Sequence, residues 1–126
     1  MTELLIEPAR AARTIEWHRV CHLDDLEDAW GEVAWVGGEQ VALFRLSPGE
    51  VHAVGHRDPA TGSHVIARGI TGSKVVAGAE RATIASPLHK QVYDLATGEC
   101  YTNPELHLRT YPTRVVDRCV EIGIAA

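Results

Sequence analysis

The fold of this chain is decided by two short polar stretches, His56-Arg57-Asp58-Pro59-Ala60-Thr61-Gly62 and Ser86-Pro87-Leu88-His89-Lys90-Gln91. The second stretch begins 26 residues after Ala60. Each contains a small hydrogen-bonding residue directly before proline, and such a side chain can bond a backbone N–H about two residues further along a turn. We therefore expect two ordered loops in which Asp58 and Ser86 hydrogen-bond the neighbouring backbone amides.

The two loops match the spacing of an iron–sulfur site whose ligands have been replaced. A Rieske centre takes Cys-x-His from one loop and Cys-x-x-His from another, because two thiolates hold one iron and two imidazoles hold the other. In that pattern Asp58 and Ser86 stand at the cysteine positions, and Ala60 stands at a histidine position. Only His89 keeps its ligand type. A methyl group cannot ligate iron and a hydroxyl is a poor substitute for a thiolate, so we expect the loops to persist without the cluster.

These residues also carry a family resemblance. With Ile66-Ala67-Arg68-Gly69-Ile70, the two loops closely resemble the small subunit of assimilatory NAD(P)H-dependent nitrite reductase, and the resemblance extends from about Ile15 to Ile124. That family has a Rieske-like fold that lacks the [2Fe-2S] ligands. The resemblance implies an all-β antiparallel sandwich or barrel, with a smaller loop-rich subdomain, the vestige of the cluster-binding one, inserted at about residues 55–103. Residues 1–13 would be an N-terminal tail, and 14–126 a single domain.

The resemblance further implies an accessory subunit with no catalytic residues and no cofactor of its own. A large partner subunit would carry sirohaem, a [4Fe-4S] cluster and FAD, and would reduce nitrite to ammonium with NAD(P)H in nitrate assimilation. Cofactors must perform that chemistry, because side chains alone cannot transfer hydrides and electrons in this way. The chain would bind and support the large subunit. Its candidate contact residues are Arg57, Asp58, Arg68, His89 and Lys90.

Two other interpretations stay open. The chain could be a cluster-less Rieske-like module that binds a different oxidoreductase, such as a component of a ring-hydroxylating oxygenase. It could also be a metal-dependent enzyme, because two histidines and a carboxylate suffice for a zinc or mononuclear iron site. The donors available near the loops are His56, Asp58, His64 and His89.

Charge and composition limit the classes of partner. The 126 residues carry a net charge of −5, which argues against nucleic acid because phosphate binding needs a basic surface. No apolar run approaches the ~18 residues of a membrane span. The first residues lack the pattern of a signal peptide, so we expect a cytoplasmic protein with no membrane partner. Residues 57–90, with five basic and two acidic side chains, contain both loops and could orient a protein partner.

Alternating apolar residues predict many short strands and little helix, which is typical of antiparallel sandwiches and barrels. The expected strands are 14–20, 32–36, 40–46, 51–54, 74–76, 82–85, 91–95, 108–116 and 118–124. Gly37-Gly38 predicts a hairpin between the second and third strands. Asp24, followed three residues later by Glu27, predicts a capped helical turn.

Cysteines and tryptophans complete the expectations. The chain contains no Cys-x-x-Cys pair, so we expect reduced thiols at Cys21, Cys100 and Cys119. The tryptophans fall in the expected β framework, where large aromatic rings usually pack in or around the core. These residues are Trp17, Trp30 and Trp35. No dinucleotide-binding Gly-x-Gly-x-x-Gly motif occurs, which gives no support to nicotinamide or flavin binding by this chain.

Overall fold

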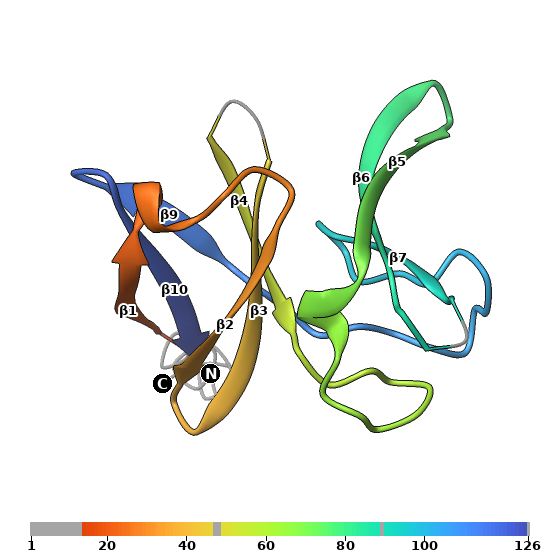
Figure 1. The fold of residues 1–126 in the computed structure, drawn as a ribbon, viewed down its shortest axis with the longest axis horizontal. Coiled ribbons are helices and arrows are strands. Elements are labelled where there is room, and N and C mark those ends of the chain that lie inside the picture. Colours follow the sequence, from red (N-terminus) through yellow and green to blue (C-terminus); the bar gives the residue numbers. More distant parts are fainter. Residues whose placement is uncertain (1–13, 47–48, 89, 126) are drawn as a thin grey trace, which may run out of the picture.

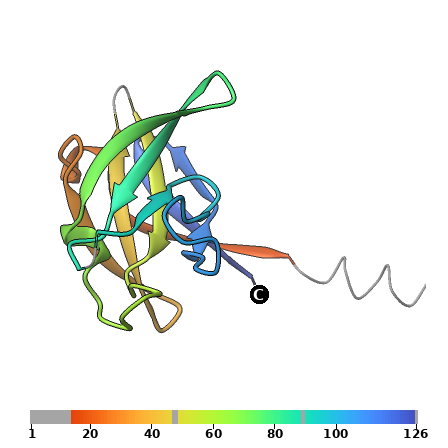
Figure 2. The same cartoon turned by 90° about the vertical axis from the view of Figure 1, so that its right-hand side faces the viewer.

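Three antiparallel sheets make up the fold in the computed structural model, which describes residues 14–46, 49–88 and 90–125 (Figures 1 and 2). The first sheet contains β1 (Ile15–His22), β10 (Cys119–Ala125) and β9 (Thr113–Val116), in that order. The second contains β2 (Gly31–Val36), β3 (Glu39–Leu46), β4 (Glu50–Gly55) and β8 (Thr110–Tyr111). The third contains β5 (Ile70–Val76), β6 (Ala79–Ala85) and β7 (Val92–Asp94). The predicted all-β antiparallel architecture is confirmed, while the proposed tail and His89 lie outside the described residues.

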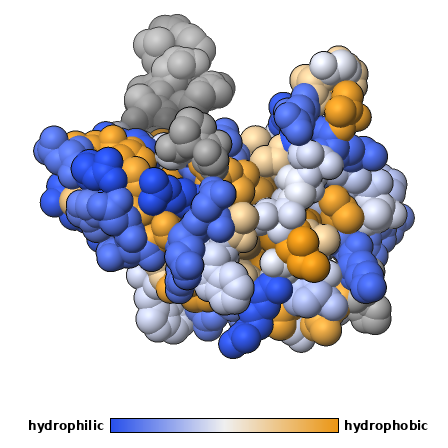
Figure 3. All heavy atoms as spheres, turned by 45° about the horizontal axis from the view of Figure 1, so that its top comes forward, coloured by the Kyte–Doolittle hydropathy of each residue, from blue (hydrophilic) through white to orange (hydrophobic). Residues whose placement is uncertain are grey.

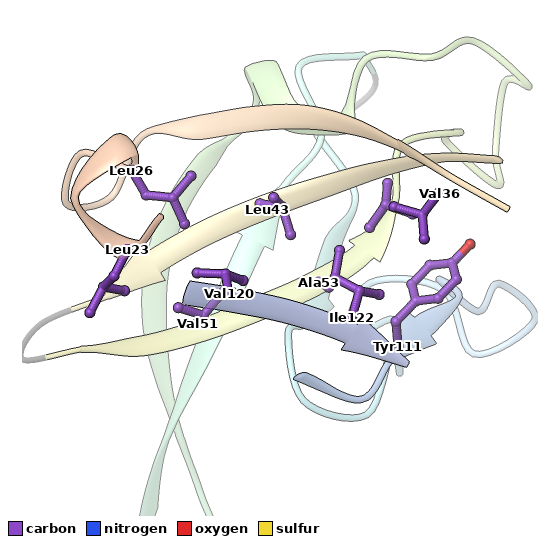
Figure 4. Close-up of a cluster of buried hydrophobic side chains, with 10 residues drawn as sticks. Leu23, Leu26, Val36, Leu43, Val51, Ala53, Tyr111, Val120 and Ile122 are labelled. Atoms are coloured by element: carbon purple, nitrogen blue, oxygen red, sulfur yellow. The ribbon is translucent and has the colours of Figure 1, made fainter. Parts of the chain in front are cut away.

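The main core lies between the first two sheets. Figure 4 shows Leu43 of β3 and Ala53 of β4 pointing toward Val120 and Ile122 of β10. Both of these β10 side chains are fully buried. Because side chains alternate between the faces of a strand, each sheet contributes every second residue to this layer. Burial of an aliphatic side chain of this size stabilises the fold by about 1.5–3 kcal/mol.

A second core covers the opposite face of the same strands. Phe44 and Val54 point away from β10 and pack in a buried cluster with Ile84 of β6, Tyr93 of β7 and Leu108. Strand β3 is therefore buried on both faces, which explains its continuous apolar run of residues 41–44. The third sheet packs against the second sheet through this cluster. The first loop follows β4 of the second sheet, and the second loop follows β6 of the third.

The hairpin of β5 and β6 projects away from the body of the protein (Figure 2). Two of its apolar residues are mostly exposed: Ile70 at the base of the hairpin, at 77%, and Val75 near its turn, at 70%. Figure 3 shows apolar residues on this projection, at the upper right of the view. Two 3-10 helices, η2 (Leu23–Asp25) and η3 (Ile66–Arg68), are the helical elements of the described residues. Neither has the length or the apolar character of a membrane-spanning helix.

Two local predictions were wrong. The expected strand 108–116 is divided at Pro112, so that β8 pairs with β4 whereas β9 pairs with β10. Proline has no N–H to donate to a ladder, and the chain changes sheets at this residue. The predicted cap at Asp24 lies two residues too late, because His22 is the N-cap and its Nδ1 accepts a hydrogen bond from the Asp24 backbone N–H at 3.2 Å.

Candidate functional site

The first loop begins where β4 ends and is closed at its base by His56. The carbonyl oxygen of His56 accepts hydrogen bonds from the N–H groups of Val65 and Ile66, at 3.0 and 3.1 Å. Its Nδ1 accepts a third from the N–H of Ala67 at 3.1 Å. Burial, followed by the nearby His64 and Arg68, lowers the pKa of His56 below its ordinary value. His56 therefore joins the two ends of the loop of residues 57–65, through its carbonyl oxygen to Val65 and Ile66 and through its imidazole to Ala67.

Asp58 organises the interior of this first loop. Its backbone N–H donates to the Ser63 carbonyl at 2.7 Å, and its own carbonyl accepts from Gly62 at 2.7 Å. The side-chain Oδ1 accepts from the Ala60 N–H at 2.8 Å. The predicted hydrogen bond from a backbone amide two residues along the chain is thereby confirmed. Gly62 has a φ of 82°, a left-handed conformation that glycine adopts without strain.

The second loop follows β6 and is built in the same way around Ser86. The Ser86 backbone N–H donates to the Gln91 carbonyl at 2.9 Å, which closes the loop. Its hydroxyl oxygen accepts from the Leu88 N–H at 3.2 Å, as predicted. Each loop therefore supplies its own backbone groups with hydrogen-bond partners.

The two loops are joined through the positions that would carry cysteine in a Rieske centre. The Ser86 hydroxyl donates a hydrogen bond of 2.5 Å to Oδ2 of Asp58. Both residues are buried, with 0% of Asp58 and 1% of Ser86 exposed. A hydrogen bond to a carboxylate is roughly twice as strong as one between neutral groups. Sequence spacing alone did not predict this contact, because the residues are separated by 28 positions.

The donor set present does not fit a [2Fe-2S] cluster. The side-chain oxygens of Asp58 and Ser86 bond each other and nearby backbone amides, so they are already engaged within the protein. Ala60 offers no ligating atom. A Rieske centre requires two thiolates and two imidazoles, whereas these positions supply a carboxylate, a hydroxyl and a methyl group. Asp58 and Ser86 instead connect the loops directly.

Tyr93 lies beneath the loop pair and is fully buried. Among the described residues its hydroxyl has no hydrogen-bond partner. Burial, the Asp58 carboxylate and Cys100 raise the pKa of Tyr93 to about 12. The phenol is therefore neutral at physiological pH, and its ring contributes mainly to the second core.

A second polar centre, at Asp94, was missed in the sequence. Arg81 approaches both carboxylate oxygens, at 2.8 and 3.2 Å, and the Tyr101 hydroxyl donates to Oδ2 at 2.6 Å. The N–H groups of Ala96 and Thr97 donate to Oδ1 at 2.8 and 3.0 Å. Burial alone would raise the pKa of Asp94, but these hydrogen bonds outweigh it and hold the pKa well below its usual range. The run Asp-x-x-Thr-Gly before a turn is the sequence signal that could have revealed this centre.

Of the predicted contact residues, three have exposed side chains: Arg57 and Arg68 near the first loop and Lys90 in the second. Asp58 is buried, so its side chain can affect a partner only by ordering the loops. Their role in binding stays a prediction, and His89 is outside the described residues. Within residues 14–46, 49–88 and 90–125, no three His, Cys, Asp or Glu side chains are grouped as a metal site would require.

The tryptophan prediction was wrong for two of the three residues. Trp17 is partly buried beneath the guanidinium of Arg114, 4.2 Å from its ring centre. Trp30 and Trp35 are 62% and 72% exposed. They lie on or next to β2, an edge strand of its sheet, where a ring can point outward as well as inward. All three cysteines are free thiols, as expected, although only Cys100 is buried.

Comparison with known proteins gives consistent results. Residues 16–123 match the family described as the Rieske-like [2Fe-2S] domain. The chain is 32% identical to the nitrite reductase (NADH) small subunit of Escherichia coli K12 over 108 residues, which are 85% of this chain and 96% of that protein. It is 34% identical over 117 residues to the nitrite reductase [NAD(P)H] large subunit of Klebsiella oxytoca, covering 93% of this chain but 12% of that protein.

Solved structures agree with these matches. A crystal structure described as an NADH-dependent nitrite reductase small subunit, from Mycobacterium tuberculosis, superposes with a TM-score of 0.82. It is 37% identical to this chain, and the match covers 90% of this chain and 98% of that one. The ferredoxin of carbazole 1,9a-dioxygenase from Nocardioides aromaticivorans has a TM-score of 0.68, with 84% of this chain and 95% of that one covered. At 21% identity, the likeness to this ferredoxin extends to the fold alone.

Proposed function

This chain belongs to the family of NADH-dependent nitrite reductase small subunits, within the Rieske-like domains, and we propose that it acts as a cofactor-less accessory subunit of nitrite reductase. It binds a large subunit that carries sirohaem, a [4Fe-4S] cluster and FAD. That subunit reduces nitrite to ammonium with NAD(P)H during nitrate assimilation, in the cytoplasm. The chain contributes binding surface and order, and no redox step passes through it.

The hydrogen bond between Asp58 and Ser86 is the observation that carries this proposal. In a Rieske protein the corresponding side chains bind iron and so hold the two loops together. Here a carboxylate and a hydroxyl join the loops directly, and their oxygens also accept hydrogen bonds from the Ala60 and Leu88 amides. An electron carrier needs a redox centre at this position, whereas a binding module needs only the ordered surface.

The Klebsiella oxytoca match supports a large nitrite reductase subunit as the partner. In that organism a segment similar to 93% of this chain is part of a polypeptide named as the large subunit. A domain that is fused to its partner in one organism and separate in another is well suited to work beside that partner. The exposed basic residues near the loops, Arg57, Arg68 and Lys90, give the surface its positive charge.

Co-expression with the large subunit of the same organism tests the proposal. We expect the two chains to elute together in size-exclusion chromatography, and the complex to reduce nitrite with NAD(P)H. The small chain purified alone should contain no stoichiometric iron or zinc. A sirohaem-containing enzyme that reduces sulfite is the matched control and should not bind. Separate elution of the two nitrite reductase chains would refute the accessory role, and a stoichiometric metal in the isolated chain would refute the absence of a cofactor.

A further inference from the structure

Two clefts flank the first loop, one on each side. The first has a volume of about 440 Å³ and is lined by Trp35, Arg57 and His107, among others. The second has a volume of about 630 Å³, and its lining includes Trp30 and Arg68. His56 and His64 line both clefts. The two clefts therefore share part of their wall at the base of the first loop.

Strand β2, together with Trp30 directly before it, presents exposed apolar side chains to these clefts. Trp30 and Trp35 are 62% and 72% exposed, and Val33 between them is 49% exposed. Val33 and Trp35 are two residues apart, so they lie on the same face of the strand. Exposed apolar groups that gather beside a cleft mark binding surfaces more often than isolated ones do. Tryptophan is also among the residues that contribute most to the free energy of binding between proteins.

The surface is already ordered in the isolated chain. His56 fixes both ends of the first loop through three backbone N–H groups. Asp58 fixes the turn within the loop and connects it to the second loop. Binding to a surface that is ordered beforehand loses less conformational entropy than binding to a mobile one.

Charges on this surface indicate the chemistry of the partner. Among the described residues, neither Arg57 nor Arg68 has a carboxylate within salt-bridge distance, although both are exposed. Arg109 differs, because it is paired with Glu39 at 2.6 Å in the first cleft. Glu32 is the acidic side chain in the second cleft. Two guanidinium groups are thus free to meet carboxylates of a partner, one at each cleft.

We propose that β2 and the first loop together form the docking surface for the large subunit. An acidic segment of the large subunit places an apolar side chain in each cleft, against Trp30 and Trp35, and its carboxylates against Arg57 and Arg68. The inference rests on the proposed function, which supplies the identity of the partner. It places the centre of the interface on the β2 side of the first loop.

Biolayer interferometry with the purified large subunit immobilised tests this surface. The variants are Trp30→Ala and Trp35→Ala, whose rings are mostly exposed, so circular dichroism should show an unchanged fold. Arg68→Glu tests the charge at the second cleft. Val75→Ala is the matched apolar control, because Val75 is 70% exposed on the projecting hairpin. Lys74→Glu is the matched charge control, because Lys74 is exposed on the projecting hairpin, outside the proposed surface.

The expected result is a loss of affinity of about 10- to 30-fold for each tryptophan variant and at least about tenfold for Arg68→Glu. Both control variants should bind within about twofold of the wild type. Wild-type affinity in the tryptophan variants would overturn this docking surface and leave the accessory function intact. Failure of the wild-type chain to bind would overturn both proposals. Self-association lost in the tryptophan variants, with unchanged binding to the large subunit, would assign the surface to a second copy of this chain instead.

Discussion

Replacement of Ser86 by alanine should destabilise the protein through the loss of one buried hydrogen bond. The Ser86 hydroxyl donates to Asp58 Oδ2 at 2.5 Å, and Asp58 is fully buried. Removal of the hydroxyl leaves a buried carboxylate oxygen without this partner, which costs about 2–3 kcal/mol. The Leu88 N–H also loses its acceptor, but Leu88 is exposed and water can replace that bond. We therefore expect Ser86→Ala to lower the free energy of unfolding by about 2–3 kcal/mol.

Asp58→Ala should cost more, about 3–4 kcal/mol, because it also removes the acceptor of the Ala60 N–H and leaves a small void. The double variant should lose about 1.5–2 kcal/mol less than the two single losses combined, since the shared bond can be removed only once. Urea denaturation followed by tryptophan fluorescence measures all three values. Ser63→Ala is a matched control in the first loop, and its hydroxyl donates no hydrogen bond to the described residues, so the expected change is under about 0.5 kcal/mol. Additive losses, within about 0.5 kcal/mol, would show that the two residues do not hold the loops together.

Three further predictions concern the polar centre and the packing around the site. Asp94→Asn should destabilise the chain by about 2–4 kcal/mol, because five hydrogen bonds converge on the carboxylate. In the wild type, folding lowers the pKa of this carboxyl group. The Asp94 carboxylate should therefore stabilise the protein above pH ~4 and lose that contribution as the pH falls further. Acid-induced unfolding of the wild type and of Asp94→Asn, monitored by circular dichroism, measures the difference in stability between them. The pKa of His56 is also lowered by folding, so the unfolded chain binds the proton more readily than the folded one. The free energy of unfolding should therefore fall as the pH drops below about 6.5. If the free energy of unfolding of a His56→Gln variant fell with pH as steeply as that of the wild type, this reasoning would be contradicted. Gly31→Ala should prevent the approach of β2 to η3, because a Cβ there would overlap the Ala67 carbonyl oxygen. A melting temperature within about 2 °C of the wild type would show that β2 and η3 move apart without cost.

The sequence was informative where a residue acts through its immediate neighbours. Asp58 and Ser86 bond backbone amides two residues along the chain, and residue type together with the following proline was enough to predict this. The Gly37-Gly38 hairpin was predictable for the same reason, since both glycines have positive φ angles. Most strand positions in the first two sheets also followed from local sequence, with the exception of β8 and β9, which were predicted as one strand.

Contacts between distant segments could not be obtained in this way. The bond between Asp58 and Ser86 joins positions 28 residues apart, and the clustering of Arg81, Asp94 and Tyr101 depends on the pairing of β6 with β7. The exposure of Trp30 and Trp35 depends on β2 being the edge of its sheet, which no local pattern reveals. Pro112 lies inside the single strand predicted over 108–116, and the sheet that each half of it joins is set by packing.

Under the proposed function, a fold that carries electrons in other proteins serves here as a binding module. Strands β3 and β4 form a platform that is buried on both faces and holds the first loop at its end. In this framework the hydrogen bond between the Ser86 hydroxyl and the Asp58 carboxylate joins the two loops at the former ligand positions. The surface around the loops can then be kept for recognition after the redox centre is lost.

Native mass spectrometry of the complex between this chain and the large subunit of the same organism is the most direct test. We predict a species that contains both subunits. On collisional activation it should release this chain at the mass of the polypeptide alone, without metal or sulfide. Absence of the complex would contradict the accessory role, and release of the chain with the added mass of an iron–sulfur cluster would contradict the claim that it works without one.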